Sequence, residues 1–106
     1  MNNTVYTIDD IQRLIRPVAA KHGVERIYLF GSYARGEATA DSDVDICVDA
    51  PKIKGLFALG GLYADLEDAL NKSLDMITVN SLKYNPDKHF VNNLNTDGVL
   101  IYEYIQ

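Results

Sequence analysis

The sequence has a single cysteine, no long apolar run and no excess of positive charge. Cys47 has no second cysteine to pair with, so an internal disulfide is excluded and a reducing compartment is expected. No stretch approaches the roughly 20 apolar residues of a membrane span, and the first ten residues lack the pattern of a signal peptide. We therefore expect a cytoplasmic protein that does not enter a membrane.

The charge balance is acidic, since 15 Asp and Glu against 10 Lys and Arg give a net charge of −5. Such a chain is poorly suited to holding nucleic-acid phosphates, and its 9% aromatic content offers no platform for stacking bases, so we expect no direct nucleic-acid partner. The excess is local, because five acids and no base lie between Gly36 and Pro51: Glu37, Asp41, Asp43, Asp45 and Asp49. This segment is where chemistry is expected.

Hydrophobic spacing predicts an α+β (α/β) fold, a small mixed sheet with helices packed on one face. A chain of 106 residues has the size of one domain, which we expect to span residues 1–106. The first helix is predicted to start after Thr7, with Asp10 completing a capping box, and to stop at Gly23. Strands are expected at 26–30, 43–49, 74–79 and 99–102, and further helices at 59–70 and 87–95.

The segment between the first two predicted strands contains a Gly-Ser pair. Gly31 has no Cβ, so the backbone there can turn tightly and approach a ligand, and Ser32 offers a hydroxyl and an N–H to a phosphate oxygen. A helical turn over 34–36 would point further N–H groups at the same anion. Alone, a Gly-Ser pair is more often an ordinary turn.

Two carboxylates open the second predicted strand. Asp43 and Asp45 are expected on the same strand face about 6.6 Å apart, where they repel each other unless a cation lies between them. Mg²⁺ fits that need because it prefers oxygen ligands and bridges to nucleotide phosphates. Asp75, early in the third strand, would join them if the strands are neighbours, giving a two-metal phosphoryl-transfer site. A solvated strand face is the alternative for an Asp-x-Asp pair alone.

The spacing of these residues resembles a known family. Gly31-Ser32, ten residues, then Asp43-Val44-Asp45 matches the G-S-x10-D-x-D signature of the DNA-polymerase-beta-like nucleotidyltransferases. The string GSYARGEATADSDVDICV is similar to the minimal nucleotidyltransferase (MNT) group, and the resemblance runs from about residue 24 to residue 102. The resemblance therefore implies the nucleotidyltransferase fold.

The resemblance also implies a role for each matched residue. Gly31 and Ser32 would hold the triphosphate of a nucleotide, and Asp43 and Asp45 would ligate Mg²⁺, of which two ions are expected. Asp75 would ligate the catalytic metal and help to deprotonate the attacking hydroxyl. Arg35, within the motif loop, has two equal interpretations, a phosphate contact or a solvated surface arginine.

Members of the MNT group resemble the antitoxins of toxin–antitoxin pairs whose toxin is a HEPN-domain ribonuclease. This implies transfer of AMP from ATP to a hydroxyl, a tyrosine, of a HEPN-type partner protein in a hetero-oligomer. Two alternatives stay open: an antitoxin that acts by binding and occlusion without catalysis, and a small-molecule nucleotidyltransferase of the aminoglycoside type. The second usually needs an additional helical domain, for which 106 residues leave no room.

The remaining reactive side chains have simpler interpretations. Cys47 falls on the acidic face of its strand by alternation, but with no histidine nearby in the sequence it is predicted to be a small buried residue. His22 and His89 lack the spacing of metal ligands, and both are predicted to lie on the surface.

Overall fold

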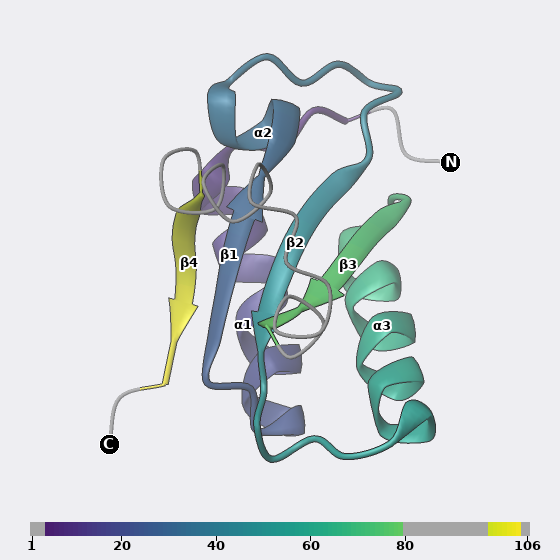
Figure 1. Ribbon diagram of the computed structural model, residues 1–106. Helices are drawn as coiled ribbons and strands as arrows, with labels where there is room; N and C mark the ends of the chain where they lie inside the picture. The colour runs from purple at the N-terminus through teal and green to yellow at the C-terminus, as the bar shows by residue number, and fades with distance from the viewer. Residues whose placement is uncertain (1–3, 80–97, 105–106) are drawn as a thin grey trace.

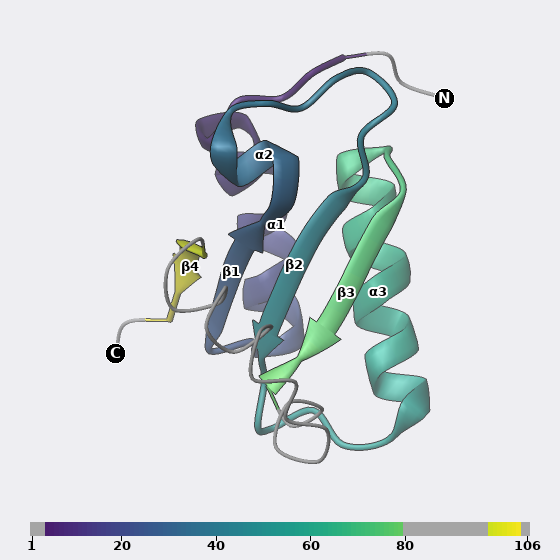
Figure 2. The same ribbon diagram turned by 45° about the horizontal axis from the view of Figure 1, so that its top comes forward.

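A computed structural model describes residues 4–79 and 98–104. Among these residues, four strands form one sheet in the order β3-β2-β1-β4, where β1 is antiparallel to β2 and β4 and β2 is parallel to β3. Helices α1 and α3 pack on one face, and α2 lies at one end of the sheet (Figures 1 and 2). This confirms the predicted mixed sheet. In chain order the elements are α1 (Ile8–His22), β1 (Arg26–Phe30), α2 (Gly31–Arg35), β2 (Val44–Asp49), α3 (Leu56–Leu70), β3 (Leu74–Thr78) and β4 (Val99–Glu103).

The ends of α1 follow the predicted signals. The Thr7 hydroxyl accepts a hydrogen bond from the Asp10 N–H, and the Asp10 carboxylate accepts one from the Thr7 N–H, both at 3.1 Å. These two bonds satisfy N–H groups that a helix start otherwise leaves unpaired. Gly23 ends the helix in the left-handed conformation, with φ 70°. Glycine adopts this conformation without a Cβ penalty, which is why α1 stops there.

Alternation along β2 turns one apolar set of side chains toward the helices. Val44, Ile46 and Val48 are all buried within the core. They meet residues at helical spacing from α1 and α3: Ile11, Ile15, Ala19, Leu62, Leu66 and Leu70. Because the inner strand β2 packs against both helices, the residues at its start are held in fixed positions relative to β1 and β3.

Several element boundaries differ from the predicted ones. Helix α3 begins at Leu56, three residues earlier than predicted, and runs through Gly60 and Gly61. The turn predicted over 34–36 belongs to α2, which already begins at Gly31. Strand β2 begins one residue after Asp43, β3 ends one residue earlier and β4 one residue later than expected. The helix predicted over 87–95 and His89 lie outside the described residues. In the described part of the chain, no helix is both long and apolar enough to cross a bilayer.

The capping box of α1 yields a stability prediction. We expect Thr7→Ala to lower the free energy of unfolding by about 1 kcal/mol, because the Asp10 N–H loses its acceptor. Urea denaturation measures the change. Arg13→Ala serves as the control, since it removes only the exposed ion pair to Asp10 at 3.0 Å and should cost less than about 0.5 kcal/mol. Equal losses in the two variants would contradict this account of the helix start.

Candidate active site

Strand register brings four of the predicted residues to one end of the sheet: Gly31, Ser32, Asp45 and Asp75. Asp45 is the register partner of Phe30 on β1 and of Asp75 on β3. Since Gly31 directly follows Phe30, the Gly-Ser pair and both carboxylates meet where β1 ends and β2 and β3 begin. The predicted neighbourhood of the Asp45 and Asp75 strands is therefore present.

Gly31 makes the closest approach in this group. A Cβ on Gly31 would overlap Oδ2 of Asp45 and lie 3.2 Å from its Cγ, so the Asp45 carboxylate occupies the space that a side chain would need. Gly31 also has φ +66°, a conformation that side-chain-bearing residues rarely adopt. Two independent requirements thus select glycine at the first position of α2.

The electrostatics of the group centre on Asp45. Burial raises the pKa of the Asp45 carboxyl, and the negative charges of Asp75 and Asp43 raise this pKa further. The Arg35 guanidinium acts in the opposite direction. Its side chain is half exposed and its Nε donates to Glu37 at 3.2 Å. The carboxylates are thus close enough to repel one another, with Arg35 as a partial counter-charge.

These carboxylates have the chemistry of a site for a hard divalent cation. Oxygen donors and unrelieved negative charge are what Mg²⁺ binding needs. In the ranges 4–79 and 98–104, however, no three His, Cys, Asp or Glu side chains are grouped closely enough to hold a metal ion. The structure brings Asp45 and Asp75 together, while Asp43 lies one residue before β2 and is exposed. Asp45 and Asp75 therefore provide oxygen ligands of the kind that Mg²⁺ binds, although no third ligand of the described residues is grouped with them.

The loop before β2 is held by a lysine that the sequence analysis missed. The Lys72 side chain is buried, and its Nζ donates to the Ala40 carbonyl at 3.2 Å and lies 5.9 Å from the centre of the Tyr6 ring. Lys72 precedes β3 by two residues, so it connects the start of β3 to the loop that carries Asp43. No sequence pattern singles out this lysine, because its acceptor is a backbone carbonyl 32 residues away.

Two further hydrogen bonds fix the start of β3 beside β2. The Tyr63 hydroxyl donates to the Leu74 carbonyl at 2.8 Å, and the Val44 N–H donates to the Ser73 carbonyl at 2.9 Å. A hydrogen bond with Glu67, together with burial and the charges of Asp75 and Asp43, raises the pKa of Tyr63. The sequence indicates only that Tyr63 lies within the helix expected over 59–70, yet its hydroxyl positions the residue before Asp75.

The other predicted side chains lie away from this group. Cys47 is fully buried, as predicted, and burial and then Asp49 raise the pKa of its thiol to about 11. The interpretation of His22 as a surface residue is wrong. Its side chain is only 20% exposed, and its Nε2 lies 2.7 Å from Oδ2 of Asp65, whose pKa is lowered by this bond and by Lys21. The pairing links α1 to α3, which no sequence spacing could show.

The comparison with protein families agrees with this geometry. The family model described as "Polymerase beta, Nucleotidyltransferase" matches residues 12–105 of the chain. The chain belongs to this nucleotidyltransferase family. The resemblance inferred from the Gly-Ser and Asp-x-Asp spacing is therefore confirmed, and so is the assignment of the protein as an enzyme of this class.

Members of the nucleotidyltransferase family similar to this chain include two archaeal proteins. One from Methanocaldococcus jannaschii, provisionally assigned as a protein adenylyltransferase, is 45% identical over 75 residues, covering 71% of this chain and 81% of the relative. Protein adenylyltransferase MntA of Thermococcus cleftensis is 38% identical over 81 residues, covering 73% and 82%. A crystal structure of a toxin–antitoxin with AMP-PNP matches with a TM-score of 0.65 at 26% identity, covering 93% of this chain and 75% of that one.

The contact between Gly31 and Asp45 yields a prediction about catalysis. Gly31→Ala should lower nucleotidyl transfer about 100-fold, because the new methyl group displaces the Asp45 carboxylate. Gly36→Ala is the matched control, since Gly36 also has positive φ but has open space where its Cβ would lie. Both variants should lose about 1 kcal/mol of stability to backbone strain, measured by urea denaturation. Equal transfer rates in the two variants would contradict the proposed importance of the contact.

The buried lysine yields a second prediction. In Lys72→Met the Ala40 carbonyl loses its charged donor, a bond of roughly 1.5 kcal/mol, so the loop should open about tenfold more often. Hydrogen exchange of the Thr39 and Ser42 amides, both hydrogen-bonded within the loop, measures this opening. The exposed Lys54→Met provides the control and should leave both exchange rates unchanged.

Proposed function

We propose that this nucleotidyltransferase transfers AMP from ATP to a tyrosine hydroxyl of a partner protein, a HEPN-type ribonuclease toxin, and acts as its antitoxin. The observation that carries the proposal is the packing of Gly31 against Asp45, with Asp75 directly across the strand pair. Relatives named as protein adenylyltransferases and a similar toxin–antitoxin with AMP-PNP support the choice of AMP and of a protein acceptor.

The nucleotide would be held at the start of α2. The missing Cβ at Gly31 lets a phosphate approach the backbone, and the Ser32 hydroxyl and N–H are donors to its oxygens. Arg35 adds positive charge near the carboxylates, since its guanidinium opposes the rise in the pKa of Asp45. These groups orient the triphosphate so that its α-phosphorus faces the carboxylates.

Asp43, Asp45 and Asp75 would hold two Mg²⁺ ions. Bound Mg²⁺ would neutralise the charge that builds up on the phosphates during transfer. The repulsion that raises the pKa of Asp45 in the protein alone is the part of the structure that a cation relieves. This is why acids that disfavour one another are assembled at one end of the sheet.

The chemical step is an in-line displacement. The acceptor hydroxyl oxygen forms a bond to the α-phosphorus while the bond to the bridging oxygen of pyrophosphate breaks. Asp75 accepts the proton of the hydroxyl, and pyrophosphate takes the electron pair of the broken bond. Asp75 is exposed, so a hydroxyl brought by another protein can reach it.

A labelling assay tests the proposed function. The chain is incubated with α-labelled ATP, Mg²⁺ and the protein encoded by the neighbouring reading frame, and the label is located by mass spectrometry. We expect AMP on a tyrosine of the neighbour with the wild type and none with Asp43→Asn/Asp45→Asn. Asp41→Asn, on the same loop, should label normally. Absent labelling by the wild type, or full labelling by the double variant, would contradict the proposal.

The Asp45 carboxylate also yields a prediction about stability: its removal should stabilise the protein although it abolishes transfer. A carboxyl whose folded pKa is raised destabilises the folded protein at neutral pH, because its charge is disfavoured there. Asp45→Asn should therefore raise the Tm at pH 7 while it abolishes transfer. Asp41→Asn, which changes an exposed acid on the loop before β2, should change neither quantity. A lower Tm in Asp45→Asn would contradict the inference that the Asp45 charge is unfavourable in the folded protein.

A further inference from the structure

The first turns of α3 expose apolar side chains that the core does not use. Leu56 is 86% exposed and Phe57 100% exposed, the two largest values among the exposed large hydrophobic residues described. The buried residues of the same helix begin only at Leu62. Neighbouring exposed apolar side chains are a feature that protein interaction sites share.

The charge around these side chains differs in sign from the rest of the chain. Between Asp49 and Asp65 the only charged residues are Lys52 and Lys54, both exposed. Taking these two charges from the net −5 leaves −7 on the remainder of the chain. We call the group Lys52, Lys54, Leu56 and Phe57 the α3 N-terminal surface; it is apolar, basic and set in an acidic molecule.

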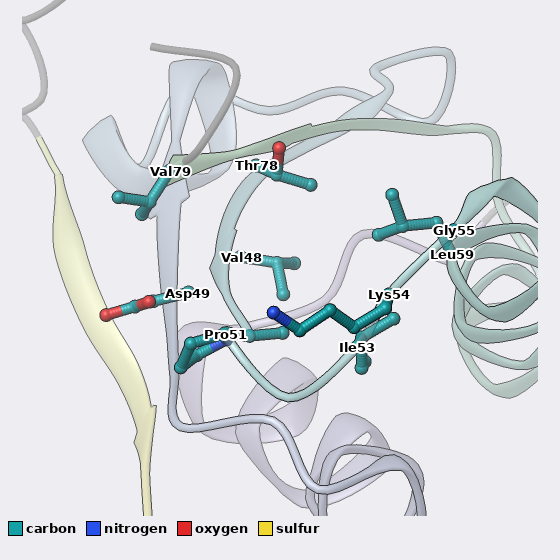
Figure 3. A pocket seen from close by; sticks show the side chains of 10 residues that line it. Val48, Asp49, Pro51, Ile53, Lys54, Gly55, Leu59, Thr78 and Val79 are labelled. Carbon is teal, nitrogen blue, oxygen red and sulfur yellow. The ribbon is translucent and has the colours of Figure 1, made fainter. Parts of the chain in front are cut away.

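A pocket of about 250 Å³ opens beside this surface. Figure 3 shows the Lys54 side chain lying across it, with its ammonium group among the other lining residues. The volume is sufficient for one aliphatic or aromatic side chain. Its lining includes Val48, Ile53, Lys54, Leu59, Thr78 and Val79.

The surface and the pocket lie at the end of the sheet opposite to α2 (Figure 1). Strand β2 separates them from the carboxylates, since Asp45 is near its start and Asp49, which lines the pocket, is its last residue. Asp45 and Asp49 are four residues apart on this strand, about 13 Å, so a small acceptor bound at Asp45 would not also fill the pocket. A folded protein can contact both ends at once.

We propose that the α3 N-terminal surface docks the partner protein. The partner inserts an apolar side chain into the pocket, and a rim of Asp or Glu side chains surrounds that side chain on the partner's surface. This inference rests on the proposed function, because it names how the protein acceptor is recognised. Lys52 and Lys54 supply the charge that such a rim complements. In a symmetric pair of this chain, each surface would meet its own copy and the lysines would repel. An anionic membrane would be repelled by the net charge of −5.

The binding experiment uses the full chain and the protein of the neighbouring reading frame. Calorimetry is performed with the wild type, with Leu56→Ser/Phe57→Ser and with Lys52→Glu/Lys54→Glu. We expect the dissociation constant to rise about tenfold or more in each variant, with the lysine effect decreasing at high salt. Tyr104→Ser, which removes another exposed aromatic side chain, is the matched control and should bind as the wild type does. The Tm of every variant confirms folding.

The outcomes separate the docking surface from the reaction. Asp43→Asn/Asp45→Asn should bind normally without transferring AMP, and Leu56→Ser/Phe57→Ser should regain normal labelling at saturating partner concentration. Wild-type binding without labelling contradicts the proposed function alone. Unchanged binding by both surface variants, or no wild-type binding, overturns the docking proposal. So does a wild-type dimer in sedimentation, or binding to phosphatidylglycerol vesicles, that Phe57→Ser abolishes.

Discussion

The repulsion among carboxylates at one end of the sheet is the constraint on which the rest of the structure depends. Asp45 is partly buried, faces Asp75 across the strand pair and fills the space left by the missing Cβ of Gly31. A negative charge so placed is unfavourable in the protein alone. The free energy that keeps it there comes from elements outside the site, chiefly the core beneath β2.

That core explains how the site keeps its geometry. The side chains of β2 alternate, so burial of Val44 and Ile46 against the helices forces Asp45 toward the opposite face. Hydrogen bonds from Val44 to Ser73 and from Tyr63 to Leu74 fix the neighbouring strand. Side chains on strands fixed by a packed core are held more precisely than side chains on loops.

In the proposed function, the chemistry takes place at one end of the sheet and the partner is recognised at the other. The end near α2 contains the acids and the glycine, and its exposed apolar side chains, Val5 at 47% and Leu100 at 42%, are less exposed than Leu56 and Phe57. The opposite end contains Phe57, its neighbouring lysines and a pocket. A protein acceptor would contact both ends, because its tyrosine has to reach Asp75 while the rest of its fold is bound at the α3 N-terminal surface. Under this proposal, the separation of the two ends selects for a large acceptor.

The sequence by itself determined the local features: the start and end of α1, the alternation of β2, and the Gly31-Ser32 and Asp43-x-Asp45 spacing that identifies the family. These depend on residues close together in the chain, where capping, periodicity and backbone conformation act. Only the tertiary structure decided that Asp75 is the register partner of Asp45, that Lys72 holds the loop, that His22 pairs with Asp65 and that Leu56 and Phe57 stay exposed. Each of these depends on strand order and on which helix face finds a partner, and no local pattern contains that information.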